Sequence, residues 1–175
     1  LSRLVMAATA TRRRLATVLN RAGGALPVTA IPQVIPAGVY DRHIAGMLDV
    51  TARTGRLFVS LCLARHHLVN LTWAEAAGAL GLPQELGTKT ARACSADLLV
   101  SGADFIATLT RVASQLDPAV DYRTREDAVR RLGRRRGWYR PWTRLHLPGR
   151  HTTSQQYAVT WLWTEYAHGH IDPSP

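Results

Sequence analysis

The sequence predicts an all-α protein, a bundle of short helices that contains a helix-turn-helix. Three observations predict this class. The Ser/Thr-x-x-acid spacing that caps helix N-termini recurs along the chain, apolar residues repeat at intervals of three and four, and glycine or proline interrupts these segments. No alternating apolar and polar stretch is long enough to form a paired strand.

Length and composition fit one generous domain or two small ones. The chain has 175 residues, of which 46% are hydrophobic, so there is material for a real core. Its formal net charge is +10, and Lys89 is the only lysine among 22 basic residues. A solvated surface does not require this imbalance, so the charge indicates a polyanionic partner such as nucleic acid.

The first forty residues divide into a helix and a connector. Apolar residues at helical spacing predict an N-terminal helix over 1–24, which two glycines end. Three prolines in 25–40 exclude regular helix there. This segment is therefore predicted to be an extended, Pro-rich connector.

A helical domain is predicted over 41–118. Asp41 has the residue type of an N-cap for a helix over 42–53, and Gly55 suits its end. The apolar stretch 56–70 follows and is expected to form the central helix of this domain.

Residues 73–94 have the spacing of a helix-turn-helix. Thr72 and Glu75 form the pattern of a capping box, so a first helix begins directly after Thr72. Gly81 suits the left-handed conformation at the end of that helix. Pro83 suits the first turn of a second helix, which extends to the end of this stretch.

The second helix of this pair carries polar side chains suited to a DNA major groove. Gly87 stands where such a helix usually has a branched aliphatic residue, and it weakens the helix by about 1 kcal/mol relative to alanine. Leu86 or Ala91 would then take the core role. Two core helices joined by a tight corner give the same local pattern, and this alternative stays open. The side chains expected to approach base edges or adjacent phosphates are Gln84, Thr88, Lys89, Thr90 and Arg92.

One more helix completes the helical domain. Ser101 and Asp104 repeat the capping spacing directly before a periodic stretch, which predicts a helix over 105–116. The Asp-Pro pair at 117–118 ends it.

A basic C-terminal helical region is predicted over 119–175. Thr124 and Asp127 have the spacing to cap a short helix over 125–132, which a glycine stops. A final helix is predicted over 156–169.

Most of the positive charge lies in residues 123–150. This segment holds ten arginines and two acidic residues, and so contributes +8 of the net +10. Charges at this density repel one another, and a polyanion would relieve the repulsion and release counterions. Trp138 lies among the arginines, as a ring that either stacks on bases or anchors a loop to the core. The arginines expected to hold a DNA backbone are Arg123, Arg125, Arg130, Arg131, Arg134, Arg135, Arg136, Arg140 and Arg144.

No catalytic or metal-binding motif appears in the sequence. A glycine-rich phosphate loop, GxSxG and HExxH are all missing, so the chain is predicted not to be an enzyme. Cys62 and Cys94 form no CxxC pair and are interpreted as buried small hydrophobes. His168 and His170 lie at a predicted helix end, where contact with the helix C-terminus is the ordinary role. Neither a metal nor another cofactor is predicted.

No segment is predicted to enter a membrane. The most apolar run, 57–71, is too short to span a bilayer and contains Arg65 and two histidines. The start of the chain places its charges after an apolar stretch, the reverse of the order in a secretory signal. The sequence therefore predicts a cytoplasmic protein.

Four stretches together cover most of 30–175: IPQVIPAGVYDRHIAGML (31–48), RTGRLFVSLCLARHHLVNLTWAEAAGALGLP (53–83), VDYRTREDAVRRL (120–132) and YAVTWLWTEYAHGHIDPSP (157–175). In this order they resemble the C-terminal part of the TniQ/TnsD family, DNA-binding proteins of Tn7-like transposons. The resemblance implies recognition of target DNA and recruitment of transposition proteins, without chemistry of the chain's own. Members commonly carry Cys-rich zinc modules and an N-terminal region that this chain lacks, which fits a C-terminal fragment or a divergent relative.

The helix-turn-helix spacing and the arginine-rich segment together predict a protein that binds double-stranded DNA and selects target sites. The alternative is a helical interaction module whose arginine-rich loop docks on an acidic protein. A third hypothesis, a nuclease or recombinase fragment, needs a group of carboxylates that no spacing in the sequence indicates. The sequence makes no prediction of oligomeric state.

Overall fold

Short helices make up the part of the chain that the structure describes. The computed structural model describes residues 26–67, 71–135 and 154–170, and the helix predicted over 1–24 lies outside these ranges. Within them there is no strand, only one isolated β-bridge. The all-α class predicted from the sequence is confirmed. In chain order the elements are η1 (Val28–Ala30), α2 (Ala37–His43), η2 (Ala45–Met47), α3 (Ala52–His67), α4 (Trp73–Ala79), α5 (Gln84–Ala96), α6 (Gly102–Ala113), α7 (Tyr122–Arg134), α8 (Ser154–Trp161) and η4 (Leu162–Tyr166), the last a π-helical turn.

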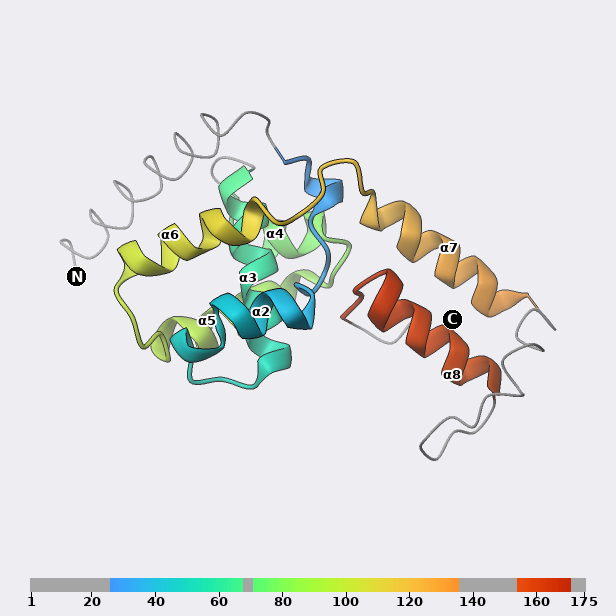
Figure 1. Ribbon diagram of the computed structural model, residues 1–175. Coiled ribbons are helices and arrows are strands. Elements are labelled where there is room, and N and C mark those ends of the chain that lie inside the picture. The colour runs from blue at the N-terminus through green and yellow to red at the C-terminus, as the bar shows by residue number, and fades with distance from the viewer. Residues whose placement is uncertain (1–25, 68–70, 136–153, 171–175) are drawn as a thin grey trace.

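Helix α3 is the centre of a bundle in which α2, α4, α5 and α6 pack around it (Figure 1). The ring of Phe58 on α3 has its centroid 5.6 Å from that of Trp73 on α4 and 5.8 Å from that of Phe105 on α6. One buried side chain thus joins three helices, and burying a phenylalanine contributes roughly 1.5–3 kcal/mol to stability. The predicted central apolar helix is confirmed, although it begins at Ala52 rather than at residue 56.

The first helix of the bundle lies earlier than predicted. The helix expected over 42–53 with Asp41 as its N-cap is wrong, because α2 already begins at Ala37. The carbonyl of Pro36 accepts the first helical hydrogen bonds, each 3.1 Å long. A proline lacks its own N–H but leaves the following N–H groups intact, so a helix can begin directly after it.

Gly55 lies inside α3 and does not end a helix as predicted. A Cβ atom at this position would overlap the hydroxyl and ring of Tyr40 on α2. The glycine therefore allows α2 and α3 to approach closely, a role that depends on tertiary structure.

The extended connector predicted over 25–40 is only partly correct, because η1 lies within it and α2 begins at Ala37. Between these two elements runs a buried strap, which we define as residues 31–35. All five of its residues are buried, and Gln33 is only 1% exposed. The backbone N–H of Val34 donates to the carbonyl of His168 at 3.0 Å. The strap is therefore a structural link between the bundle and the C-terminal part of the chain.

The turn between α4 and α5 forms by the predicted local interactions. The hydroxyl of Thr72 accepts a hydrogen bond from the Glu75 N–H at 3.2 Å, and the Glu75 carboxylate accepts one from the Thr72 N–H at 2.7 Å. This is the predicted capping box. Gly81 has a φ of 70°, the left-handed conformation that lets the chain turn sharply after α4.

Helix α5 crosses α4 at Gly87. A Cβ atom on Gly87 would overlap the backbone carbonyl of Trp73 and lie 2.9 Å from the Cβ of Ala77. Ala91 is buried and Leu86 is packed against the same core, as the sequence predicted for the core positions of this helix. The glycine that weakens an isolated helix is the residue that permits this contact.

The predicted caps of the next two helices are partly correct. Ser101 accepts a hydrogen bond from the Asp104 N–H at 3.2 Å, but α6 begins at Gly102, directly after the cap, and not at residue 105. Helix α7 is longer than predicted, and the prediction that Thr124 caps it is wrong, because Thr124 lies inside the helix. It begins after Asp121, whose carboxylate accepts from the Thr124 N–H at 3.0 Å, and it continues past Gly133.

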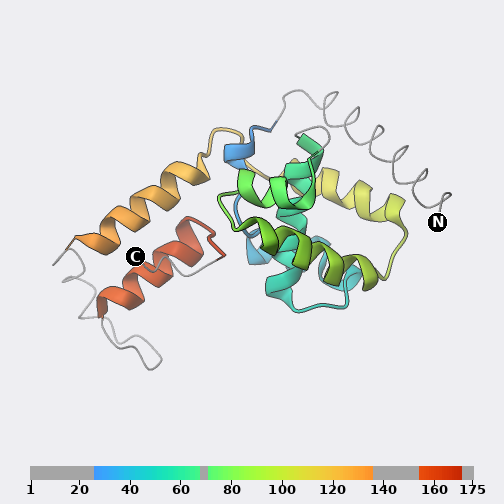
Figure 2. The same ribbon diagram turned by 180° about the vertical axis from the view of Figure 1, so that it is seen from behind.

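Helices α7 and α8 with η4 form a hairpin that projects from the bundle (Figures 1 and 2). Val129, Trp163 and Ala167 form a small buried cluster of their own between these elements. Gly169 lies so close to the ring of Trp163 that a Cβ atom would overlap it. The helix predicted over 156–169 is therefore present as α8, which begins two residues earlier and ends in the π-helical turn η4.

Candidate nucleic-acid interface

Helix α5 has one face in the bundle core and the other in solvent, on the side of the bundle seen in Figure 2. The buried face contacts α3 and α4. Four side chains from the predicted groove-facing set are exposed on α5. They are Gln84, Thr88, Lys89 and Arg92.

Thr90 does not belong to this exposed face. Its side chain is on the inward stripe with Gly87, Ala91 and Cys94, and Thr90 is only 5% exposed. The prediction that Thr90 approaches DNA is wrong, because a helix places positions three and four apart on the same side.

The exposed face of α5 has a positive balance. Lys89 and Arg92 are exposed there beside a single carboxylate, Glu85. The residue before the helix, Pro83, has no side-chain hydrogen bond to the first turn, so these backbone N–H groups have no such cap. Helix N-termini carry partial positive charge and favour anions. The positive side chains of α5 and the direction of its helix dipole therefore both favour an anion near the start of this helix.

Two arginines of α7 contact aromatic residues of η4, the other side of the hairpin. The guanidinium carbon of Arg130 lies 4.9 Å from the ring centroid of Trp163, and its Nη1 lies 3.2 Å from the Asp127 carboxylate. Arg125 lies 4.7 Å from the ring centroid of Tyr166 and donates to its carbonyl at 3.2 Å. Their role in the structure is to hold α7 against η4, and contact of either with phosphate stays a prediction.

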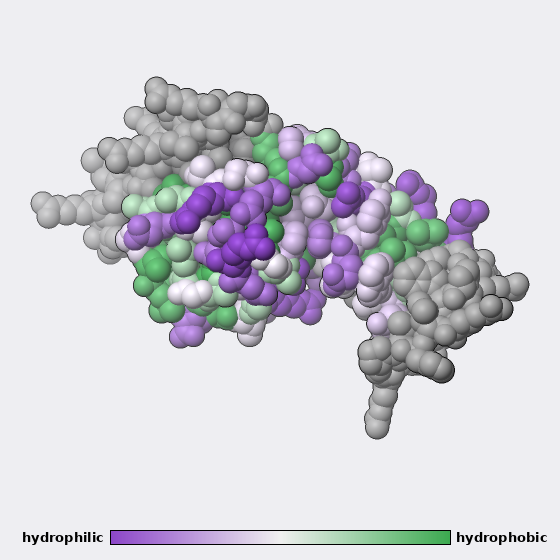
Figure 3. Space-filling model, viewed as in Figure 1, coloured by the Kyte–Doolittle hydropathy of each residue, from purple (hydrophilic) through white to green (hydrophobic). Residues whose placement is uncertain are grey.

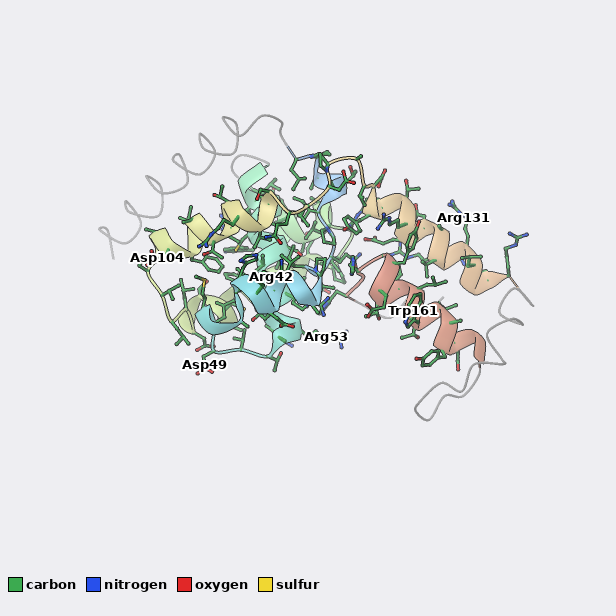
Figure 4. The ribbon with its side chains drawn as sticks, viewed as in Figure 1. Arg42, Asp49, Arg53, Asp104, Arg131 and Trp161 are labelled. Carbon is green, nitrogen blue, oxygen red and sulfur yellow. The ribbon has the colours of Figure 1, made fainter. Side chains whose placement is uncertain are left out.

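The end of α7 presents arginines to solvent. Arg131, Arg134 and Arg135 are exposed there. Figure 4 shows Arg131 projecting from α7 away from α8. Within the described ranges, the side chains of Arg131 and Arg134 take part in no hydrogen bond or ion pair. The other predicted backbone contacts, Arg136, Trp138, Arg140 and Arg144, lie outside the described residues.

The opposite side of the bundle provides a contrast. Hydrophilic side chains gather over α2 and α6 in Figure 3, and the exposed residues of these two helices include both arginines and carboxylates. Arg42 and Arg111 are exposed together with Asp41 and Asp104. These charges offset one another, whereas the last turn of α7 contains arginine and no acid.

The side chain of Arg123 is 22% exposed and its guanidinium is already held by contacts within the fold, so its contact with a DNA backbone stays a prediction. Its Nη2 lies 2.8 Å from the carboxylate of Glu126 and donates to the carbonyl of Ile31 at 3.0 Å. The Glu126 carboxylate also accepts a hydrogen bond of 3.1 Å from the side-chain amide of Gln33. This amide donates to the carbonyl of Leu80 as well, at 3.2 Å. We call Gln33, Arg123 and Glu126 the junction network, because it joins the strap, α7 and the α4–α5 turn.

Burial disfavours the charged forms of Glu126 and Arg123 in the junction network. Desolvation raises the pKa of Glu126 to about 7, against the lowering effect of Arg123 beside it. Desolvation also lowers the pKa of Arg123, and Glu126 partly offsets this. Both shifts have the same cause, since an ion pair removed from water loses solvation that its own attraction only partly replaces.

The junction network was not predicted from the sequence. In the sequence, Glu126 is one of two acidic residues among the ten arginines of 123–150. The signal that could have found it is the spacing of Tyr122, Glu126 and Val129, which lie on one stripe of α7, and all three are buried. A carboxylate on the apolar stripe of a helix requires a buried partner.

The histidines and cysteines have structural contacts. The Nδ1 of His168 lies 3.1 Å from the carbonyl of Thr164, as predicted for a histidine at a helix end. The backbone N–H of His170 donates to the Oε1 of Gln33 at 2.9 Å. Cys62 and Cys94 are both buried, which confirms their interpretation as core residues.

Comparisons with protein-family models, with curated proteins and with solved structures found no match to this chain. In the part of the chain that the structure describes, no group of three His, Cys, Asp or Glu residues is arranged to hold a metal ion. None of the described helices has both the length and the apolar character that crossing a bilayer requires.

Proposed function

We propose that this chain binds double-stranded DNA, with the exposed face of α5 in the major groove. The observation that carries the proposal is the division of α5 into a packed face and a polar, basic one. Gln84, Thr88 and Arg92 are spaced four apart and all exposed, so they project in one direction from a helix held rigidly by the core. Gln, Thr, Lys and Arg are the side chains that pair with base edges.

The geometry of the α4–α5 pair supports this placement. In helix-turn-helix proteins the second helix enters the groove with its N-terminal residues at the bases, while the first helix crosses the backbone. Here the turn at Gly81 is tight and α5 packs closely on α4 through Gly87. The first exposed polar residue of α5, Gln84, directly follows the turn.

The exposed arginines at the end of α7 supply the second part of the proposed interface. Arg131 and Arg134 carry charge that no acid in the last turn of α7 offsets. Contact with phosphates would release counterions and give sequence-independent affinity.

The resemblance to the TniQ/TnsD family extends the proposal to a role. We propose target-site recognition in Tn7-like transposition, with recruitment of transposition proteins as the outcome of binding. Such a role requires no chemistry of the chain's own. The alternative, docking on an acidic protein, uses the same positive charge, and the experiment must therefore separate the two.

A titration of the full chain against a fluorescent random-sequence duplex tests the proposal. We expect binding at low salt, with the logarithm of affinity falling linearly as the logarithm of salt rises. The double variant Lys89→Ala/Arg92→Ala should bind more weakly. The matched control is Arg42→Ala/Arg111→Ala, which removes the same charge from the opposite side of the bundle.

Equal losses from the two double variants would mean that only net charge matters, which contradicts placement of α5 at the DNA. Absence of binding to duplex at low salt, together with binding to an acidic polypeptide such as polyglutamate, would favour the interaction module.

A further inference from the structure

We propose that Gln33, Arg123 and Glu126 are positioning residues for DNA binding. Their buried contacts fix the hairpin against the α4–α5 turn, so that α5 and the basic end of α7 meet the same duplex in one orientation. The inference rests on the proposed DNA binding and adds a mechanism by which two separate parts of the chain act as one interface.

Gln33 is the centre of the junction network. Its Nε2 donates both to the carbonyl of Leu80 in the α4–α5 turn and to the carboxylate of Glu126 in α7, at 3.2 and 3.1 Å. Its Oε1 accepts from the backbone N–H of His170, just after the hairpin, at 2.9 Å. One side chain in the strap thus contacts the turn of the proposed DNA-reading pair, helix α7 and the segment that follows η4.

Arg123 adds a second link to the same turn. It pairs with Glu126 at 2.8 Å and donates to the carbonyl of Ile31 in the strap at 3.0 Å. Its guanidinium also lies beside Gly81, where the Nη1 would be 3.3 Å from a Cβ atom. A glycine at this turn therefore serves two purposes: it allows the left-handed backbone and leaves room for the arginine.

Apolar packing does not supply this orientation by itself. The buried apolar residues of the bundle and those of the hairpin form two separate clusters. Apolar burial is non-directional, whereas hydrogen bonds restrict both distance and angle. The junction network supplies directional contacts between the two clusters, together with the hydrogen bond from the Val34 N–H to the His168 carbonyl and the one from Arg53 to the His170 carbonyl.

Fixed orientation has a direct consequence for affinity. When two surfaces on one molecule can engage a ligand together, the second contact forms at high effective concentration, and this gain disappears if the geometry prevents simultaneous contact. Loss of the junction network should therefore weaken DNA binding without removing any residue that touches DNA.

Three variants of equal charge separate positioning from electrostatics. Glu126→Ala removes the carboxylate that Gln33 and Arg123 share. Glu126→Gln keeps one of its two oxygen acceptors, for Gln33 or for Arg123, and Asp127→Asn makes the same charge change at the exposed neighbour. Gln33→Met provides an independent test, because it keeps the length of the side chain and removes its hydrogen bonds.

Spin labels on the full chain report orientation in the absence of DNA. Ser95→Cys on α5 and Thr160→Cys on α8 place labels at exposed positions of the two parts, and the native Cys62 and Cys94 are buried. We expect a narrow distance distribution for the unmodified network, for Glu126→Gln and for Asp127→Asn. Glu126→Ala and Gln33→Met should give broad distributions.

Affinity for a random duplex is measured on the same variants without labels. Glu126→Ala and Gln33→Met should bind about tenfold more weakly than Asp127→Asn, with a reduced salt slope, and Glu126→Gln should restore binding. Narrow distances in Glu126→Ala and Gln33→Met would overturn the positioning role even if DNA binding is real. Broad distances with unchanged affinity would also overturn it.

Two other outcomes are informative. If none of the proteins binds duplex, the DNA-binding proposal fails, and the positioning role for DNA fails with it, while the distances still show whether the network sets orientation. If both disruptive variants lose helical circular dichroism, the network maintains the fold itself, and the positioning role is overturned.

Discussion

Gly87 of α5 lies directly against the backbone carbonyl of Trp73 in α4, closer than any residue with a Cβ atom could approach. This contact sets how near α5 comes to α4, and therefore which face of α5 is left in solvent. A residue that disfavours helix in isolation is required here by the crossing of two helices.

Gly87→Ala should destabilise the protein although alanine is the better helix former. The intrinsic gain of about 1 kcal/mol is opposed by an overlap with backbone that cannot move freely, for which overpacking costs of about 1–3 kcal/mol are typical. Urea denaturation followed by circular dichroism measures the net change. The control is Gly78→Ala on α4, whose Cβ would meet nothing closer than 3.9 Å and which should be neutral or stabilising. A stable Gly87→Ala protein would show that α5 does not pack on α4 as described.

Local signals in the sequence were sufficient for the helix ends that depend on nearby residues. The capping box of Thr72 and Glu75, the left-handed Gly81 and the cap at Ser101 are all interactions within four residues, and all three predictions are confirmed. Gly55 and Gly87 could not be interpreted in this way, because their partners are on other helices. A glycine required for close packing has the same local pattern as one that ends a helix.

The candidate site was predicted in part for a similar reason. Charge and helical spacing predict the exposed side chains of α5, but residue type alone does not place Thr90, a polar residue that lies on the inward stripe with Gly87 and Cys94. Composition alone does not distinguish Arg123, which pairs with Glu126, from the exposed arginines of α7. Its partner Glu126 and the buried Gln33 come from segments 93 positions apart, and only the fold brings them together.

Sequence preference should depend on α5 and not on α7. Lys89→Ala or Arg92→Ala should change which duplex is preferred and cost about 1–3 kcal/mol at the preferred site if a good base contact is lost. Arg134→Ala should weaken binding to all duplexes alike, because phosphates are the same in every sequence. Selection of bound duplexes from a random pool, followed by sequencing, compares the three variants. If all three variants selected the same duplex sequences, α5 would not contact base edges in the groove.

Neighbouring arginines on α7 should differ in what they stabilise. Arg130→Gln removes a guanidinium stacked on Trp163, worth about 0.5–2 kcal/mol, and a partly exposed pair with Asp127 that adds little. Arg131→Gln removes the same charge from an exposed position. We expect Arg130→Gln to lower the free energy of unfolding of the hairpin and Arg131→Gln to leave it unchanged.

For DNA binding we expect the reverse order: Arg131→Gln should have the larger effect and Arg130→Gln the smaller one. Arg131→Gln should reduce the salt slope by about 1, as expected when one phosphate contact is lost. Hydrogen exchange of α7 and α8 reports stability, and duplex titration at several salt concentrations reports the slope. Equal effects of the two substitutions on both measurements would contradict separate roles for Arg130 in packing and Arg131 in DNA binding.

The buried carboxylate of Glu126 should make stability depend on pH. Burial raises the pKa of Glu126 from an ordinary value of 4.5 to about 7, with Arg123, Arg130 and Asp127 as the charged groups that act on it. Between these two values the folded protein holds a proton that the unfolded chain has lost. The free energy of unfolding therefore falls as the pH rises through this window.

Glu126→Gln removes this dependence, because an amide does not titrate. The free energy of unfolding of Glu126→Gln relative to the unaltered protein should be lowest near pH 4.5 and increase by about 1–3 kcal/mol by pH 8. Burial also lowers the pKa values of His168 and His170, but both proteins keep these residues and the contribution cancels. Urea denaturation at pH 5, 6, 7 and 8 measures this difference in the free energy of unfolding. The control is Asp127→Asn, which makes an equal charge change and for which the difference should not increase with pH. A difference that decreases with pH would mean that the attraction between Glu126 and Arg123 exceeds the desolvation that opposes it.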